Sequence, residues 1–457
     1  MTLPSNSYAP PEPPLLMPQN PRKPSYAPLE VPPEVPASSL PELPSPPRAK
    51  SSLPPALARD YKLTTHIVTA AWPRLPSQLY DPAAYEVPQN EGKAERRARV
   101  DQIYAKLDGS RILADRGEGP ARKEVLYNVL NRYRRKDRWI REGGERGITL
   151  FVTHGVGFPK EASVVLRAAF RFAWMGDWNV PFLDALLTSP IIFAVQIWEY
   201  TLAKLVDQTE HSPHGPKINE IWAFEAYNHG ESALINEGNM GTMNCFEDTT
   251  RDIINFMLNY LPHNAGADYR NLPVHLKRLP REIAEGRRTL GYAGDRTVVG
   301  LGHSAGAAVM EEALSLYRIS PSFSYWDSDV LKAFVDHGII EDLKGGVRLK
   351  TPTIQEAMWF MEADALTKAY ETLARLPPSV ELLLLYSSRS SAGTGGEIST
   401  RHVAYRRPKN TRNLKLDSSH LMVQESPQLV ADTVFDFLDK RYSRAAKDAS
   451  ISVGARL

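Results

Sequence analysis

Short apolar runs alternate with helical patterns along most of the chain, and this alternation predicts the fold. Seven runs are apolar or rich in β-branched residues, which favours β-strands; they span residues 64–70, 125–132, 148–152, 221–224, 298–301, 382–386 and 413–416. The runs between 148 and 386 show no polar alternation, as expected for strands covered on both faces. Helical patterns separate them over residues 95–107, 248–260, 307–317 and 430–442. We therefore predict an α/β fold with a mostly parallel sheet and helices on both faces.

The two segments outside this alternation have different compositions. Residues 1–60 hold 18 of the 37 prolines, and such a segment buries too little apolar surface to offset its ordering entropy. We predict that it is disordered, with a Pro-x-x-Pro ligand as the alternative. Residues 318–378 are instead predicted as a helical cap, in which Thr353 and Glu356 form a capping box that opens a helix over residues 354–373.

Charge and cysteine content exclude several classes of protein. The net charge of +2 gives no global field toward nucleic acid or membrane. The basic, aromatic-containing run at 132–139 resembles a nucleic-acid patch, but its alternating charges favour a solvated hairpin. One cysteine, Cys245, permits no intramolecular disulfide. The apolar stretch 185–198 is shorter than the ~20 residues that span a bilayer, so we expect a buried or cap helix and no transmembrane segment.

The most informative motif follows the run at 298–301. Gly302-His303-Ser304-Ala305-Gly306 stands between a β-branched run and helix-favouring residues. This is the strand, G-x-S-x-G, helix arrangement of a nucleophile elbow, in which the serine lies on a strained turn above a parallel sheet. The glycines allow a close approach that a Cβ atom would prevent. We predict Ser304 as a nucleophile; the alternative is an ordinary glycine-rich turn.

A serine nucleophile needs a base to accept its proton. In α/β-hydrolases this histidine follows the serine and the acid in the chain. His402 and His420 are the histidines beyond residue 337. His420 lies just after the last predicted strand and before the last helix, so we predict it as the general base. Its alternative is a histidine of a surface loop.

The oxyanion hole needs two backbone N–H groups. One should come from Ala305, the residue after the nucleophile, and the other from Val156 in the loop after the third strand. His154 in that loop is expected to be structural. His229, in the loop after the fourth strand, is also more often structural than catalytic at such a position. The chemistry requires no metal or cofactor.

The acid of the triad is the difficult assignment. It should end a strand after the elbow helix, but no apolar run ending in aspartate occurs there. Glu397, in the glycine-rich loop after residues 382–386, is the best remaining candidate. Asp327 and Asp329 are weaker candidates because they are expected to begin a helix over residues 330–337 as N-caps.

Four blocks in the correct order resemble a fungal α/β-hydrolase family that includes the mycophenolic acid acyl-CoA hydrolase, the AK-toxin biosynthesis hydrolases and the yeast peroxisomal lipase. They cover residues 153–161, 221–236, 252–262 with 302–304, and 419–427. The resemblance spans about residues 61–442 and implies the α/β-hydrolase fold, with Ser304 as nucleophile and His420 as base; we predict the domain over residues 61–457. In the family an aspartate acid ends the strand after the elbow helix; here that strand is missing, and residues 162–196 look inserted.

The missing strand should lie inside the sheet, so its loss leaves backbone donors and acceptors of two neighbours unpaired. Either these neighbours pair directly, another segment fills the gap, or the chain folds poorly, and we expect a distorted site beside Ser304. The leading hypothesis is a hydrolase of small-molecule esters or acyl-CoA thioesters. The rivals are an impaired relative that binds an acyl ligand or partner without turnover, and a scaffold recruited through the proline-rich segment.

The C-terminal residues Ala455-Arg456-Leu457 resemble the S-K-L peroxisomal address. Together with the peroxisomal members of the family, they imply a peroxisomal protein recognised by the import receptor. If the import receptor does not recognise the tripeptide, we expect a cytoplasmic protein.

Overall fold

The computed structural model describes most of the predicted elements. The described residues are 7–11, 29–44, 53–74, 76–85, 91–115, 118, 120, 122–136, 147–154, 197–243, 246–262, 271–290, 297–302, 327–341, 347–352, 354–355, 358, 370, 373–374, 376, 379–389, 397–407 and 409–443. The predicted helix at 307–317 and the residues suspected of being inserted, 162–196, lie outside them.

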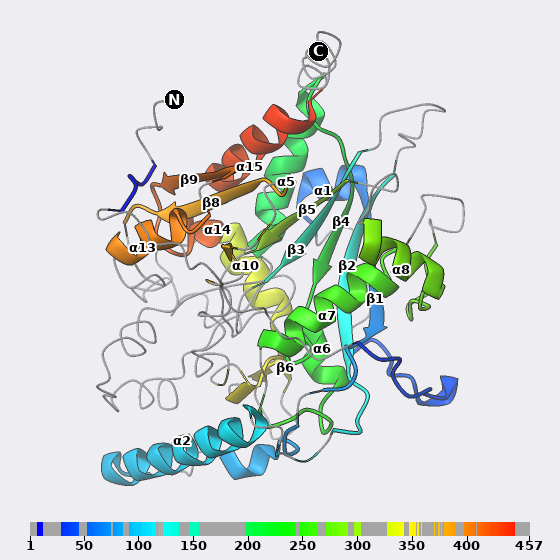
Figure 1. Ribbon diagram of the computed structural model, residues 1–457, viewed down its shortest axis with the longest axis vertical. Helices are drawn as coiled ribbons and strands as arrows, with labels where there is room; N and C mark the ends of the chain where they lie inside the picture. The colour runs from blue at the N-terminus through cyan, green and yellow to red at the C-terminus, as the bar shows by residue number, and fades with distance from the viewer. Residues whose placement is uncertain are drawn as a thin grey trace.

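A five-stranded mixed sheet forms the centre of the fold (Figure 1). Its strands are β1 (Tyr61–Thr69), β2 (Tyr127–Arg135), β3 (Ile148–Thr153), β4 (Ile218–Phe224) and β5 (Thr297–Gly302), in the order β1-β2-β4-β3-β5. β2 is antiparallel to both β1 and β4, whereas β3 is parallel to β4 and β5. This sheet, with helices on both faces, confirms the predicted α/β-hydrolase fold.

The absence of polar alternation in the central strands has a direct cause. In β4, Ile221 and Ala223 belong to one hydrophobic cluster, and Trp222 and Phe224 belong to another on the opposite face. The first cluster is covered by α1 (Pro55–Asp60), α5 (Ile197–His211) and α15 (Pro427–Tyr442). The second lies under α7 (Phe246–Asn259), which packs beside α8 (Arg281–Leu290) (Figure 1). Both sides of the sheet are therefore buried.

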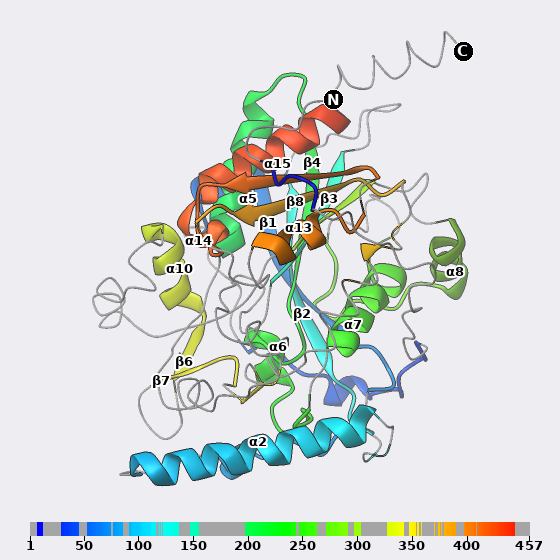
Figure 2. The same ribbon diagram turned by 60° about the vertical axis from the view of Figure 1, so that its left-hand side comes forward.

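The remaining elements surround this core. They are η1 (Ala37–Ser39), η3 (Pro82–Tyr85), α2 (Lys93–Asp115), α6 (Gly230–Ile235), α10 (Ser328–His337), β6 (Ile339–Glu341), β7 (Val347–Leu349), α13 (Glu397–Ala404) and α14 (Met422–Glu425). β6 and β7 form an antiparallel hairpin, so the region predicted as a helical cap also contains strands. Figure 2 shows α2 at the far end of the molecule from α15. No described helix is long and apolar enough to cross a bilayer.

The last two strands stand apart from the main sheet. β8 (Leu382–Ser387) and β9 (Thr411–Leu416) form a parallel pair of their own. Within the described residues, neither β5 nor β8 has a second pairing partner. Residues of β5 and β8 are mostly half-buried, whereas those of β3 are nearly all buried. The strands before and after the missing one, β5 and β8, therefore do not pair directly with each other among the described residues.

The interpretation of the basic run at 132–139 is wrong for its first four residues. They lie in β2, where Arg132, only 1% exposed, pairs with Glu220, and Arg135 pairs with Glu210. Arg132 neutralises the buried Glu220 and Arg135 pairs with the half-buried Glu210, so these residues form neither a solvated hairpin nor a nucleic-acid patch. Residues 137–139 lie outside the described part.

The described parts of the proline-rich segment contact the domain. Tyr8 is buried against β9. The backbone N–H of Glu30 donates to the carbonyl of Trp72, and the carbonyl of Pro41 is hydrogen-bonded to His275. Leu40 and Leu43 pack against the cluster that contains Ile67, Tyr127 and Val129.

Candidate active site

Three parallel strands end level with one another at the edge where the predicted catalytic loops begin. Thr153 of β3 is in register with Phe224 of β4 and with Gly302 of β5. The carboxyl ends of parallel strands carry the ligand and catalytic loops of open α/β sheets. Val156 follows β3 in the sequence, and Ser304 and Ala305 follow β5; all three lie outside the described residues.

The last residue of β5 shows why glycine is needed there. A Cβ atom added to Gly302 would lie 3.3 Å from the Thr153 Oγ1 atom of the neighbouring strand. This distance is tighter than an ordinary van der Waals contact, so a larger residue would push the two strand ends apart. The close neighbour among the described residues is β3; the predicted approach of the strand to the elbow helix stays a prediction, because that helix lies outside the described residues.

His154 and His229 form a buried pair beside this edge. Their ring centroids are 4.9 Å apart. The Nε2 atom of His154 accepts the backbone N–H of Ala226 at 2.9 Å, so in the neutral ring Nδ1 carries the proton. His229 Nδ1 lies 2.7 Å from the amide oxygen of Asn228 and must donate, since this oxygen only accepts.

Burial lowers the pKa of His229 well below its usual value, and the neighbouring His154 lowers it further. His229 is therefore neutral at physiological pH. These contacts join the loop after β3 to the loop after β4, which is the kind of role expected of structural histidines.

The His420 loop follows β9 and is held from two sides. Ser387, the last residue of β8, donates its hydroxyl to the carbonyl of Ser418 at 2.7 Å. On the other side, Glu425 Oε2 accepts the backbone N–H of Ser419 at 3.0 Å and the Ser418 hydroxyl at 3.2 Å. Burial lowers the pKa of His420, and the negative charge of Glu425 opposes that shift. His420 is therefore neutral near pH 7, as a general base must be.

The helix α5 connects the two halves of the candidate site. Its Trp198 donates the indole N–H to the carbonyl of Thr153 at 3.2 Å, at the end of β3. The same helix contacts α14, which begins two residues after His420. The backbone N–H of Asp327 also donates to the carbonyl of Gln424 in α14. Helix packing thus links the His420 loop to the edge of the main sheet.

The predicted acids occupy different settings. Glu397 is the first residue of α13; its side chain is 57% exposed and accepts from Arg401 at 2.8 Å. The Oδ1 atom of Asp327 accepts the backbone N–H groups of Asp329 and Val330. Asp327 is thus the N-cap of α10, as expected, whereas Asp329 lies within the first turn.

Glu425 was not among the acids predicted from the sequence. The carboxylates considered, Glu397, Asp327 and Asp329, all precede the histidine, whereas Glu425 lies in the short helix after it. Its spacing of six residues from Ser419 within one loop is the sequence signal that could have identified it.

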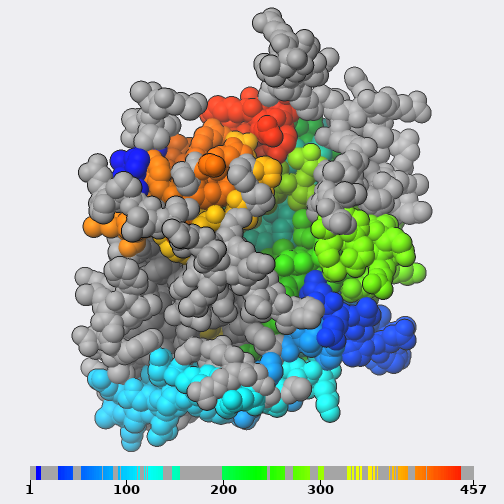
Figure 3. Space-filling view, viewed as in Figure 1, coloured from blue at the N-terminus to red at the C-terminus, as the bar shows by residue number. Residues whose placement is uncertain are grey.

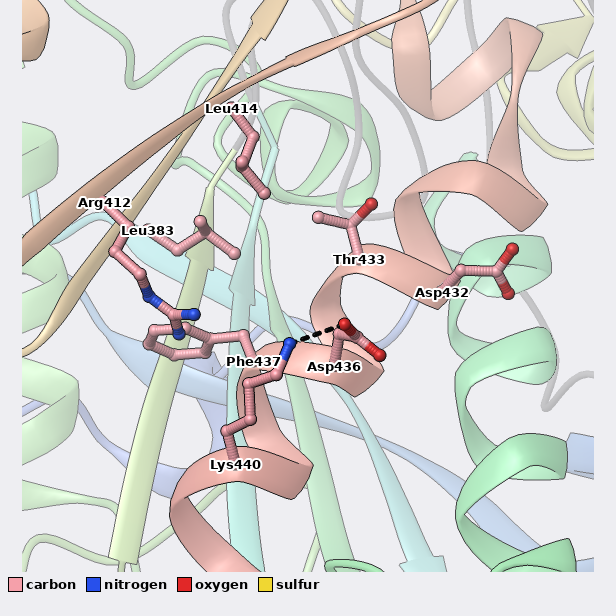
Figure 4. A pocket seen from close by; sticks show the side chains of 8 residues that line it. All are labelled: Leu383, Arg412, Leu414, Asp432, Thr433, Asp436, Phe437 and Lys440. Atoms are coloured by element: carbon pink, nitrogen blue, oxygen red, sulfur yellow. Dashed lines mark hydrogen bonds and ion pairs between the residues drawn. The ribbon is translucent and has the colours of Figure 1, made fainter. Parts of the chain in front are cut away.

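A cavity of about 350 Å³ lies away from this edge, between the β8–β9 pair and α15 (Figure 4). Figure 4 shows Leu383, Leu414 and Phe437 around it, with Arg412 over the Phe437 ring at 5.2 Å. Leu383 and Arg412 are second in their strands, far along them from the His420 loop. The cavity is therefore separate from the candidate active site. Within the described part of the chain, no group of three His, Cys, Asp or Glu residues could hold a metal ion.

No protein-family model matches the sequence, and no curated protein does either. Among solved structures, the chain is similar to the peroxisomal α/β-hydrolase Lpx1 from Saccharomyces cerevisiae, with 14% identity, a TM-score of 0.49, and coverage of 87% of this chain and 97% of that one. It is also similar to an E-2-(acetamidomethylene)succinate hydrolase (13% identity, TM-score 0.33, 68% and 96% covered). A third similar structure is the thioesterase domain from the curacin biosynthetic pathway (11% identity, TM-score 0.30, 68% and 95% covered).

Proposed function

We propose that this protein is a serine hydrolase that cleaves an ester or an acyl-CoA thioester. In this mechanism His420 removes the proton from the Ser304 hydroxyl as its oxygen attacks the acyl carbonyl. The backbone N–H groups of Ala305 and Val156 stabilise the resulting oxyanion. His420 then gives its proton to the leaving alcohol or thiol, and activates the water that hydrolyses the acyl-Ser304 intermediate.

The observation that carries the proposal is the convergence of elements at one edge. β5 ends two residues before Ser304, level with β3, whose next loop contains Val156. The His420 loop is linked to this edge through the contact of α14 with α5 and the hydrogen bond from Trp198 to Thr153. Its burial keeps the imidazole neutral and able to accept a proton.

For the acid we retain Glu397 as the sequence candidate and set Glu425 beside it. Glu397 would have to leave Arg401 before it could orient a histidine. Glu425 already acts on His420 electrostatically and holds the loop backbone. The orienting carboxylate matters because its loss can cost ~10⁴ in kcat while the oxyanion hole and binding preserve some catalysis.

The test is labelling of the purified protein with a fluorophosphonate probe, followed by ester and acyl-CoA hydrolysis assays. We expect labelling of the wild type and none of Ser304→Ala or His420→Ala. Comparison of Glu397→Gln with Glu425→Gln assigns the acid to the variant that loses labelling rate. Wild-type protein that does not label at Ser304 would reject the hydrolase, and would favour the alternative of an impaired relative that binds an acyl ligand without turnover.

We further propose peroxisomal import through Ala455-Arg456-Leu457. The support is the sequence itself, since these residues lie outside the described part. A fluorescent fusion at the N-terminus should enter peroxisomes, and deletion of the three residues should leave it in the cytoplasm.

A further inference from the structure

Residues 7–11 of the proline-rich segment lie on the surface formed by β8, β9 and α13. In Figures 1 and 2 this dark-blue segment runs beside β9 and α13, and in Figure 3 its atoms lie against the orange surface of the same elements. Tyr8 and Pro11 are both buried, whereas Ala9 and Pro10 between them are exposed. Burial of side chains three residues apart is typical of a proline-rich peptide in the extended polyproline II conformation.

Side chains of the domain satisfy both backbone polar groups of Tyr8. Its N–H donates to the Asn413 Oδ1 atom of β9 at 2.7 Å. Its carbonyl accepts the hydroxyl of Tyr405, just after α13, at 2.8 Å. A side chain on either side of one residue fixes the direction of the backbone there, which a purely apolar contact would not do.

The ring of Tyr8 occupies an aromatic and cationic pocket. It packs edge-on against Tyr386 of β8, with ring centroids 5.6 Å apart, and the Lys415 ammonium lies 4.2 Å from its centroid. Its hydroxyl is hydrogen-bonded to the side chain of Thr400. Only 6% of the residue is exposed. An anchor with aromatic, cation–π and polar contacts gives affinity as well as specificity for tyrosine.

The sequence contains this peptide twice. Ser7-Tyr8-Ala9-Pro10 recurs as Ser25-Tyr26-Ala27-Pro28. The second copy ends two residues before Glu30, whose backbone N–H is bound at Trp72. The first copy alone is followed by proline, and that proline, Pro11, is buried.

We propose that the surface of Tyr386, Thr400, Tyr405, Asn413 and Lys415 is a recognition site for an extended Ser-Tyr-Ala-Pro-Pro peptide, filled in cis by residues 7–11. The site reads the tyrosine through its ring and hydroxyl, and reads the peptide direction through Asn413 and Tyr405. It lies on the two-stranded sheet and α13, and not at the edge of the main sheet where β3, β4 and β5 end.

Occupation in cis needs only modest intrinsic affinity. A short tether gives an effective concentration on the order of 1 mM, so an intrinsic Kd of ~0.1 mM keeps about nine sites in ten filled. Removal of the internal occupant should therefore make the site bind an added peptide about 10-fold more tightly.

The experiment measures binding of a fluorescent peptide with the sequence of residues 6–14 to the full-length protein by polarisation. The variants are Tyr8→Ala, which empties the site, and the matched control Tyr26→Ala, which makes the same change in the other copy. Tyr8→Ala should bind the peptide about 10-fold more tightly than the wild type, and Tyr26→Ala should bind as the wild type does. Circular dichroism checks that every variant remains folded.

Two further arms test the specificity of the site. A peptide in which its tyrosine is replaced by alanine should not bind to Tyr8→Ala. Adding Tyr405→Phe to Tyr8→Ala removes one neutral hydrogen bond to the peptide and should weaken binding about 2- to 10-fold. The proposal is overturned if Tyr8→Ala does not bind the peptide, if Tyr26→Ala has the same effect as Tyr8→Ala, or if the alanine peptide binds equally well.

Discussion

Replacement of Arg74 by methionine is expected to destabilise the fold strongly, because it removes the cation from a buried cluster. The Arg74 Nη1 atom lies 2.6 Å from Asp252 Oδ1, and its Nε atom lies 3.2 Å from Asp248 Oδ2. The side chains of Arg74 and Asp252 are 2% and 0% exposed. The guanidinium also stacks 4.1 Å from the ring centroid of Tyr227, in the loop that carries His229. The cluster therefore supports one rim of the candidate active site.

The size of the effect follows from what each carboxylate retains. Asp248 keeps Arg251 at 2.8 Å, whereas Asp252 keeps the backbone N–H of Ala71 and loses its cation. Removing one partner of a buried ion pair costs about 3–5 kcal/mol. With an m value of about 3 kcal/mol/M, the urea midpoint should fall by about 1–1.7 M.

The loss should depend on pH with a definite sign. Burial raises the pKa of Asp252 to about 6, even though Arg74 lowers it. Without Arg74 the folded-state pKa rises further above the unfolded value. A raised carboxyl pKa contributes stability that is complete below the unfolded pKa near 4 and is lost as pH rises through the folded pKa. The deficit of Arg74→Met should therefore be small near pH 4 and grow toward pH 8.

Urea unfolding of the wild type and variants between pH 4 and 8 measures this. Arg59→Met is the control, since Arg59 pairs with Asp60 and Asp207 but is 52% exposed, and exposed pairs contribute under about 1 kcal/mol. Adding Asp252→Asn to Arg74→Met should restore part of the stability by removing the buried charge. A deficit below about 1 kcal/mol, or one that neither varies with pH nor responds to Asp252→Asn, would refute the reasoning.

Glu425→Gln should move the acidic limb of the kcat/KM profile to lower pH, because the carboxylate raises the pKa of His420; an unmoved limb in ester hydrolysis would contradict this. Gly302→Ala places a Cβ atom 3.3 Å from Thr153 Oγ1. It should slow labelling by fluorophosphonate strongly and lower the melting temperature only slightly. Adding Thr153→Ala to the same chain should restore labelling if that contact is the cause. Backbone amides of β8 and β9 should exchange with solvent through openings of lower free energy than those of β3 and β4, since the pair forms a separate sheet; equal protection in native-state hydrogen exchange would count against a separate unit.

Much of the fold could be predicted because the central strands are buried on both faces. Residues such as Trp222 and Ala223 face different helices, so the whole run must be apolar and stands out in the sequence. The end of β2 could not be predicted in this way. Arg132 and Arg135 look solvated in isolation, and only partners such as Glu220, far along the chain, allow them to be buried.

Features that depend on a single distant contact were harder to predict. The composition of residues 1–60 is a property of the whole segment. It therefore does not indicate that one residue, Tyr8, is buried against the domain. The carboxylate beside His420 was missed for a different reason, because its contacts with Ser418 and Ser419 are local. A rule that places the acid at a strand end does not consider Glu425. This residue lies in α14, and its carboxylate contacts the histidine loop because the chain turns back between Ser419 and that helix.

The separation of the two sheets changes which contacts set the distance between the proposed nucleophile and the proposed base. In a continuous sheet, hydrogen-bond register between neighbouring strands would fix the position of the His420 loop relative to Ser304. Here β8 and β9 are paired with each other, and among the described residues the connection to the main sheet runs through helix packing, from Thr153 to Trp198 and from α5 to α14. A helix contact tolerates small sliding movements that a strand ladder does not, because packed side chains shift more readily than paired backbone groups. The geometry of the proposed catalytic pair therefore depends on the packing of α5 against α14 and α15 more than on the sheet itself.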